Sequence, residues 1–167
     1  MVKTAAIVIV SFVAVGGLAR ADAFDSVVRL AGSWEGRSTR GFTEQQTVRV
    51  VARGSAVLFT TEFVGSAGEG MATVYHRDGD ALVVTHYCEA GNQPTLALVK
   101  ESPDGATLEF AFLRGGNIAS RDVGHMDRLI LRFVDRNHYV ERWTWYQDGK
   151  EKWLEEIVYR RVDAETR

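Results

Sequence analysis

The chain has 167 residues, with 20 Lys or Arg against 22 Asp or Glu, and its formal net charge is −2. No basic cluster stands out, so composition speaks against nucleic acid as a partner. The single cysteine, Cys88, excludes a disulfide within the chain. Its thiol is buried, reactive or paired with another chain, and burial is the usual state of a free cysteine.

The N-terminus has the pattern of a secretory signal peptide. Lys3 supplies a short positive region, and residues 4–18 form a mostly apolar run. The tripeptides at 19–21 and 21–23 are Ala-Arg-Ala and Ala-Asp-Ala, and both fit a cleavage site. We therefore predict a signal peptide over residues 1–21, cleaved after Ala21 or Ala23, and a periplasmic or secreted protein. An uncleaved anchor is the alternative, but no later apolar stretch could form an integral membrane span.

Residues 24–163 are expected to form a single domain that begins with one short helix. Asp25 is its expected N-cap, Ser26–Ala31 its body and Gly32 its stop. Val27, Val28 and Leu30 give this helix an apolar side. So short a helix must pack against the rest of the domain.

From Trp34 onward the chain reads as short segments rich in Val, Thr, Phe, Tyr and Trp, separated by turn signals such as Asp78-Gly79. One strand about every ten residues is typical of a sandwich or barrel. The predicted strands are Ser33–Arg40, Thr47–Ala52, Ala56–Val64, Met71–Arg77, Ala81–Cys88, Thr95–Glu101, Thr107–Leu113, Met126–Val134, His138–Tyr146 and Lys150–Val162. Pairing the first strand with the last removes two exposed edges. The sequence therefore predicts an all-β antiparallel up-and-down barrel of about ten strands, closed at one end by the helix.

Gly32-Ser33-Trp34 on the first strand, after a short helix, with an arginine on the last strand, resembles the calycin superfamily. This group includes lipocalins, fatty-acid-binding proteins and nitrobindins. The segment 75–94 also resembles a motif of uncharacterised bacterial lipocalin-like proteins. The resemblance implies that Arg160, or its neighbour Arg161, lies across Trp34 as a cation–π contact near the closed end of the barrel. We assign this structural role to Arg160.

Two features depart from these families. Fatty-acid-binding proteins have a helix–turn–helix between their first two strands, where this chain has only a short segment around Gly41-Phe42. Nitrobindins hold haem through a histidine roughly six residues before the closing arginine. The corresponding stretch here, 153–156, has no histidine. We therefore predict no cofactor and do not expect haem by that ligand.

Side chains alternate between the two faces of a strand, so parity decides which residues share a compartment. In the hairpin around Asp78-Gly79, Tyr75, His86 and Cys88 share one face with Met71, Thr73, Leu82 and Val84. We predict that this face is the interior, and the face of His76 is the alternative. His76 and His86 point to opposite sides, so no metal site is predicted. His86 and Cys88 lie about 7 Å apart on a strand, too far for a direct nucleophilic pair.

The segment 139–145 places Tyr139, Glu141, Trp143 and Trp145 at alternate positions. Pairing around Asp148-Gly149 sets Glu141 opposite Glu156. If this face is interior, the cavity has two indole walls and two carboxylates that raise each other's pKa. The alternative is that Arg142, Arg160 or a neighbour neutralises the acids.

The loop 89–94 lies at one rim, where the amides of Asn92 and Gln93 are placed to meet polar ligand groups. We predict a non-enzymatic protein that binds a small, mostly apolar or aromatic ligand. The predicted ligand-binding residues are Tyr75, His86, Cys88, Asn92, Gln93, Glu141, Trp143, Trp145 and Glu156. One alternative is an enzyme that uses His86 or the Glu141/Glu156 pair as its acid–base group. The other is an interaction module that forms a homodimer without a ligand.

Overall fold

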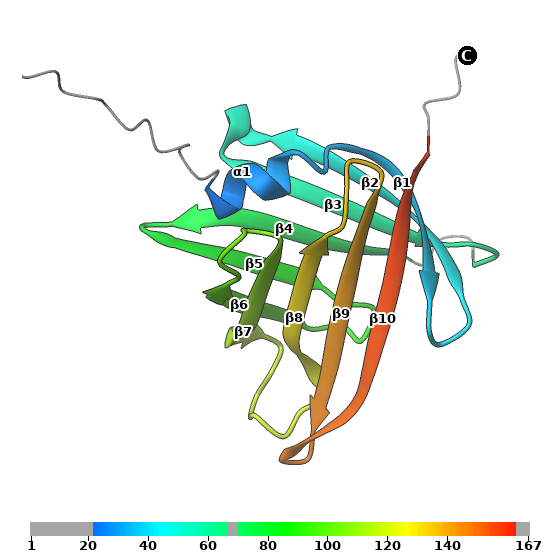
Figure 1. Cartoon of the computed structure of the whole chain (residues 1–167). Coiled ribbons are helices and arrows are strands. Elements are labelled where there is room, and N and C mark those ends of the chain that lie inside the picture. The colour runs from blue at the N-terminus through cyan, green and yellow to red at the C-terminus, as the bar shows by residue number, and fades with distance from the viewer. Residues whose placement is uncertain (1–21, 67–69, 163–167) are drawn as a thin grey trace, which may run out of the picture.

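The computed structural model describes residues 22–66 and 70–162 (Figure 1). The predicted signal peptide lies outside the described residues. The described part begins with helix α1, Ala23–Val28. Its N-cap is Asp22, whose side chain accepts a 2.8 Å hydrogen bond from Phe24 N. The expected cap, Asp25, instead lies in the first turn, where its negative charge suits the helix N-terminus.

Ten antiparallel strands follow and form a closed barrel, which confirms the predicted fold class (Figure 1). Each strand pairs with the next, and β1 pairs with β10. The strands are β1 Gly32–Ser38, β2 Thr43–Val51, β3 Ala56–Phe63, β4 Gly70–Asp78, β5 Ala81–Tyr87, β6 Gln93–Glu101, β7 Thr107–Gly116, β8 His125–Phe133, β9 His138–Gln147 and β10 Lys150–Val162. Among the described residues, no helix is both long and apolar enough to cross a bilayer.

Helix α1 packs against one end of the barrel, and we call the half of the barrel beneath it the closed half. Phe24, Val27 and Leu30 are buried there. Asp22 also forms a 2.7 Å ion pair with Arg77 at the end of β4. Burial of this apolar side explains why so short a segment is helical, since an isolated helix of this length would be marginal in water.

Apolar side chains fill the closed half. Its buried members include Trp34, Val48, Val57, Phe59, Tyr75, Leu82, Val84, Leu96, Leu108, Phe110 and Leu131. The Trp34 indole donates a 2.8 Å hydrogen bond to Leu30 O, which ties the first strand to the helix. Tyr75 lies inside this core, with its ring centroid 4.9 Å from that of Phe59 and 5.8 Å from that of Phe110.

The arginine over Trp34 is Arg161, and the assignment to Arg160 is wrong. The Arg161 guanidinium carbon lies 4.1 Å from the indole centroid, and its nitrogens donate to Ala31 O and Arg136 O. Side chains alternate along β10, and Tyr159 points inward. Arg160 therefore points outward, where its nearest acidic partner is Glu35 at 3.9 Å.

The β4–β5 hairpin confirms the predicted interior face. Asp78 pairs with Ala81, so Thr73 lies opposite His86 and Tyr75 opposite Val84. The turn is Gly79-Asp80 and not the expected Asp78-Gly79, so the cross-strand partners are shifted by two residues from those that the expected turn would give. A shift of two residues preserves parity, so each side chain keeps its predicted face.

In the β9–β10 hairpin, by contrast, the predicted faces of the β10 residues are wrong. A bulge between Glu151 and Trp153 shifts the register by one residue, so Glu141 lies opposite Ile157 and Trp143 opposite Glu155. A shift of one residue exchanges the two faces. Glu155 therefore points inward, and Glu156 points outward.

Candidate functional site

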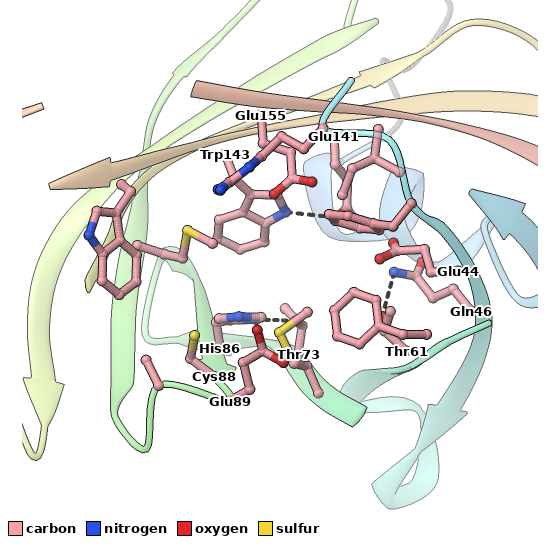
Figure 2. Close-up of a pocket in the computed structure, with 18 of the residues that line it drawn as sticks. Glu44, Gln46, Thr61, Thr73, His86, Cys88, Glu89, Glu141, Trp143 and Glu155 are labelled. Atoms are coloured by element: carbon pink, nitrogen blue, oxygen red, sulfur yellow. Dashed lines mark hydrogen bonds between the residues drawn. The ribbon is translucent and has the colours of Figure 1, made fainter. Parts of the chain in front are cut away.

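The end of the barrel away from α1, which we call the open half, encloses a cavity of about 960 Å³ (Figure 2). Strands β2 to β5 and β8 to β10 contribute inward-facing side chains, and loop residues at this end form its rim. The lining residues are Arg40, Phe42, Glu44, Gln46, Thr61, Phe63, Val64, Ser66, Met71, Thr73, His86, Cys88, Glu89, Ala90, Met126, Glu141, Trp143, Trp145, Trp153, Glu155, Ile157 and Tyr159. Arg40, Val64 and Glu89 are exposed, so the cavity reaches the protein surface.

Five of the nine predicted binding residues line this cavity. They are His86, Cys88, Glu141, Trp143 and Trp145. They lie on β5 and β9, except Cys88, which directly follows β5.

The other four predicted binding residues lie elsewhere. Tyr75 is on the interior face but in the packed core of the closed half. Asn92 donates a 2.8 Å hydrogen bond to Gly124 O, and Gln93 donates to Gly91 O, so both amides hold loops together. Glu156 faces outward, 3.4 Å from the Arg142 guanidinium. The predicted Glu141/Glu156 acid pair is therefore wrong, because the bulge places the two carboxylates on opposite faces of the sheet.

Indole rings form one wall of the cavity. The Trp145 and Trp153 rings stack with centroids 5.5 Å apart and planes within 3° of parallel. At the rim, the Arg40 guanidinium carbon lies 4.2 Å from the centroid of Trp153. Deeper in the cavity, the Trp143 ring lies 4.9 Å from the His86 ring. These flat surfaces suit an aromatic or aliphatic ligand body.

His86 sits on the opposite wall as a neutral, buried imidazole. Its Nδ1 is hydrogen-bonded to the Thr73 hydroxyl at 2.9 Å, and the residue is only 3% exposed. Burial lowers the pKa of His86 to about 4, so the ring is uncharged at neutral pH. Its Nε2 is buried and has no hydrogen-bond partner in the part of the chain that the structure describes.

Three carboxylates converge on the cavity from β2, β9 and β10 (Figure 2). Glu44, which is 1% exposed, accepts a hydrogen bond from the Tyr159 hydroxyl through Oε1, and burial raises its pKa to about 7. Glu141 accepts a 2.9 Å hydrogen bond from the Trp143 indole, and burial raises its pKa to about 8. Glu155 accepts a 2.5 Å hydrogen bond from the Ser38 hydroxyl.

A layer of hydrogen-bonded polar side chains separates the cavity from the apolar core. Gln46 donates to Thr61 Oγ1 and to the Tyr159 hydroxyl, both at 3.1 Å, and accepts from the Tyr139 hydroxyl. The two tyrosine rings stack with centroids 4.5 Å apart. Gly36 permits this arrangement, because a Cβ there would lie 2.6 Å from the Tyr159 ring. We call Glu44, Gln46, Tyr139 and Tyr159 the polar floor.

The cavity offers little for nucleophilic or metal chemistry. Burial raises the pKa of the Cys88 thiol, which disfavours the reactive thiolate. Within the described ranges, no group of three His, Cys, Asp or Glu side chains has an arrangement suited to a metal ion. Glu155 occupies the last-strand stretch where the resemblance would require a haem-binding histidine, and a carboxylate held by Ser38 does not fit that role.

Sequence reasoning missed Glu44, Gln46, Trp153 and Glu155. For β2 a signal existed: Glu44, Gln46 and Val48 alternate with outward-facing residues. Alternation of polar residues is usually taken as an outer face, yet here it marks a wall that is polar because it borders a cavity. For Trp153 and Glu155 the sequence carries no comparable signal, because their placement depends on the bulge.

Comparison with known proteins supports the fold alone. No protein-family model and no curated protein matches the sequence. Among solved structures, Rv2717c from M. tuberculosis superposes with a TM-score of 0.58 at 16% identity, covering 86% of this chain and 99% of that one. A protein of unknown function from the DUF3598 family of Nostoc punctiforme gives a TM-score of 0.55 at 12% identity. That match covers 81% of this chain, which spans about half (49%) of the Nostoc protein. The chain is thus similar to these two proteins in its fold.

Proposed function

We propose that this protein binds a small molecule with an apolar or aromatic body inside the open half of its barrel. The observation that carries the proposal is the cavity of about 960 Å³, lined by indoles and a few buried polar groups. Ligand sites typically have volumes of about 300–1,000 Å³ and this mixture of apolar walls and convergent polar atoms. The exposed rim residues give a ligand a route inward.

We also propose that the mature protein is exported, on the strength of the N-terminal sequence pattern. Asp22 favours Ala21 over Ala23 as the cleavage point. It caps α1 and pairs with Arg77, and cleavage after Ala23 would remove it. N-terminal sequencing of the protein recovered from its export compartment tests both the export and the cleavage point.

Ligand binding is tested first by native mass spectrometry of the protein purified from that compartment, which detects a retained molecule. A second measurement uses the neutral fluorophore N-phenyl-1-naphthylamine, whose emission rises in an apolar pocket. We expect saturable binding at one site. Absence of both a retained molecule and saturable binding would overturn the proposed function.

A matched pair of histidine variants locates the binding site. His86→Ala removes a cavity wall and is expected to weaken fluorophore binding severalfold. His76→Ala changes the same residue type in the same hairpin on the outer face, where the imidazole Nδ1 is hydrogen-bonded to Arg77 O, and is expected to leave binding unchanged. Equal effects of the two substitutions would place the ligand outside the barrel.

The homodimer remains an alternative prediction. Exposed apolar side chains on the outside of the barrel, such as Val99, Leu113 and Leu154, are the surface it would use. Light scattering over a range of concentrations measures the oligomeric state.

A further inference from the structure

We infer that the cavity selects ligands that carry a protonated amine, whose N–H groups are held by Glu44 with Glu141 and Glu155 while the indoles hold the ligand body. This inference rests on the proposed function and specifies the ligand's chemical class. It identifies a recognition site within the cavity and no particular molecule.

The first observation is an acceptor without a donor. Glu44 Oε2 is buried and has no hydrogen-bond partner in the described residues, although Glu44 lines the cavity and is 1% exposed. A buried carboxylate oxygen without a donor is costly in free energy. An N–H group in the cavity would satisfy it, which a hydrocarbon could not do.

The second observation is the charge of the lining. Among the described residues of the lining, four carboxylates, from Glu44, Glu89, Glu141 and Glu155, stand against a single cationic side chain, that of Arg40. Arg40 lies at the exposed rim with its guanidinium over Trp153. The deeper acids are therefore left without a cationic partner from the lining, and an anionic ligand would meet repulsion.

The third observation is the nature of the donors that the acids already have. Glu44 is bonded by a phenol, Glu141 by an indole and Glu155 by a hydroxyl. These donors are neutral, and they orient the carboxylates without cancelling their charge. An ammonium group placed among them would form charge-assisted hydrogen bonds, which are the stronger kind. Figure 2 shows the three acids around one space, with His86 across it.

A primary ammonium fits better than a quaternary one. Glu44 Oε2 requires an N–H donor, and a quaternary nitrogen has none. His86 Nε2 adds a second buried polar atom without a partner on the facing wall. If the Thr73 hydroxyl donates to Nδ1, the ring proton is on Nε2, which can donate a hydrogen bond to the ligand. In the other tautomer, Nε2 can accept a hydrogen bond from the ligand.

The raised pKa values give amine binding a distinctive pH dependence. Glu44 and Glu141, with pKa values raised to about 7 and 8 by burial, are largely protonated below neutral pH. A bound ammonium favours their ionised forms, so amine binding expels protons. Other titratable or charged groups also face these acids. They are Glu155 and Tyr159 on β10, Tyr139 on β9, Tyr75 on β4, His86 on β5, Cys88 just after β5, Arg161 near Tyr139, and Arg40 and Glu89 at the rim.

The experiment measures displacement of N-phenyl-1-naphthylamine from the full-length mature protein by three probes of similar shape. They are 2-phenylethylamine, 2-phenylethanol and phenylacetate, which differ in charge. We expect the amine to bind at least about tenfold more tightly than the alcohol at pH 8, with the acid weakest, because a hydrogen bond to a charged group contributes more than a neutral one. The amine's affinity should rise between pH 6 and pH 9, and the alcohol's should not.

Isosteric variants identify the residues responsible. Glu44→Gln and Glu141→Gln keep side-chain size and the ability to accept from Tyr159 or Trp143, and each is expected to remove most of the preference for amine over alcohol. Glu62→Gln, an exposed position on β3, is the control and should leave the preference intact. Calorimetry in two buffers with different ionisation enthalpies should show proton release for the amine only.

The outcomes separate the two proposals. If the fluorophore binds but amine and alcohol displace it equally, the cavity binds ligands and the amine inference is wrong. If the preference survives both Gln substitutions, the acids are not its cause and the inference is also wrong. If the fluorophore never binds and no molecule is retained by the purified protein, the proposed function itself has failed.

Discussion

The two halves of this barrel differ in what their inward-facing side chains form, which is an apolar core in one half and a cavity in the other. In the closed half, the inward-facing residues are large and apolar, and they meet at the axis beneath α1. In the open half, the same strands present acids, an imidazole and indoles around a cavity of about 960 Å³. The polar floor divides the two. The difference teaches that an apolar core can occupy only part of the interior of this barrel, so that the remainder forms a cavity.

The largest contrast is expected from truncating one side chain in each half of β8. Leu131→Ala creates a hole in the closed half and should lower the free energy of unfolding by about 3 kcal/mol. Met126→Ala only enlarges an existing cavity and should cost about 1 kcal/mol. Urea unfolding with an unchanged m-value measures both. Equal losses would mean that the open half is also a stabilising core.

The second contrast concerns pH. Glu141 has a folded-state pKa of about 8 against an ordinary value of 4.5. Between these values the folded state retains a proton that the unfolded state releases, so stability falls as pH rises, by on the order of 2–4 kcal/mol. Glu141→Gln should flatten the decline between pH 5 and pH 9. Glu44 contributes with the same sign and remains in both proteins, so the difference between their curves isolates Glu141. A wild-type stability that rises across this window would contradict the buried position of the acid.

A smaller effect tests the cation–π contact at the closed end. Arg161→Ala removes a guanidinium that covers Trp34 and donates to three backbone carbonyls, and should cost about 1–2 kcal/mol. Arg160→Ala changes its outward-facing neighbour and should remain within about 0.5 kcal/mol of wild type. Thermal unfolding of the two variants side by side provides the measurement. The reverse order would restore the assignment made from sequence.

The smallest effect is expected at the N-cap of α1. Asp22→Ala removes the acceptor for Phe24 N and should cost about 1 kcal/mol. Asp22→Asn retains a capping oxygen and should recover most of this loss. Chemical denaturation distinguishes the two variants. If both are equally destabilised, the ion pair with Arg77, and not the cap, is the stabilising contact.

Much of the fold was predictable because its signals are local. Turn signals such as Asp78-Gly79 separated the strands, and all ten predicted strands overlap the observed ones. The helix was predicted three residues late because Asp22 and Asp25 are both competent caps, and only packing against the barrel end selects between them.

The site was only partly predictable because parity fixes a face but not a depth or a distant register. Tyr75 is on the interior face, as predicted, but lies too deep to reach the cavity. Glu156 exchanged places with Glu155 because of a one-residue bulge that no sequence signal announced. Glu44 was overlooked because the alternation of Glu44, Gln46 and Val48 resembles a solvent-exposed face until the neighbours from other strands are known.

The pairing of β1 with β10 determines when the barrel can close during folding. Its register joins Ser33 to Val162 and Ser38 to Ile157, partners about 120 residues apart in the chain. Pairings so distant in sequence form slowly, because the loop between them must first be closed at an entropic cost. A chain emerging N-terminus first, from a ribosome or through a membrane pore, therefore keeps β1 unpaired on one side until its last strand has followed. Assembly of the barrel is consequently a late, whole-chain event.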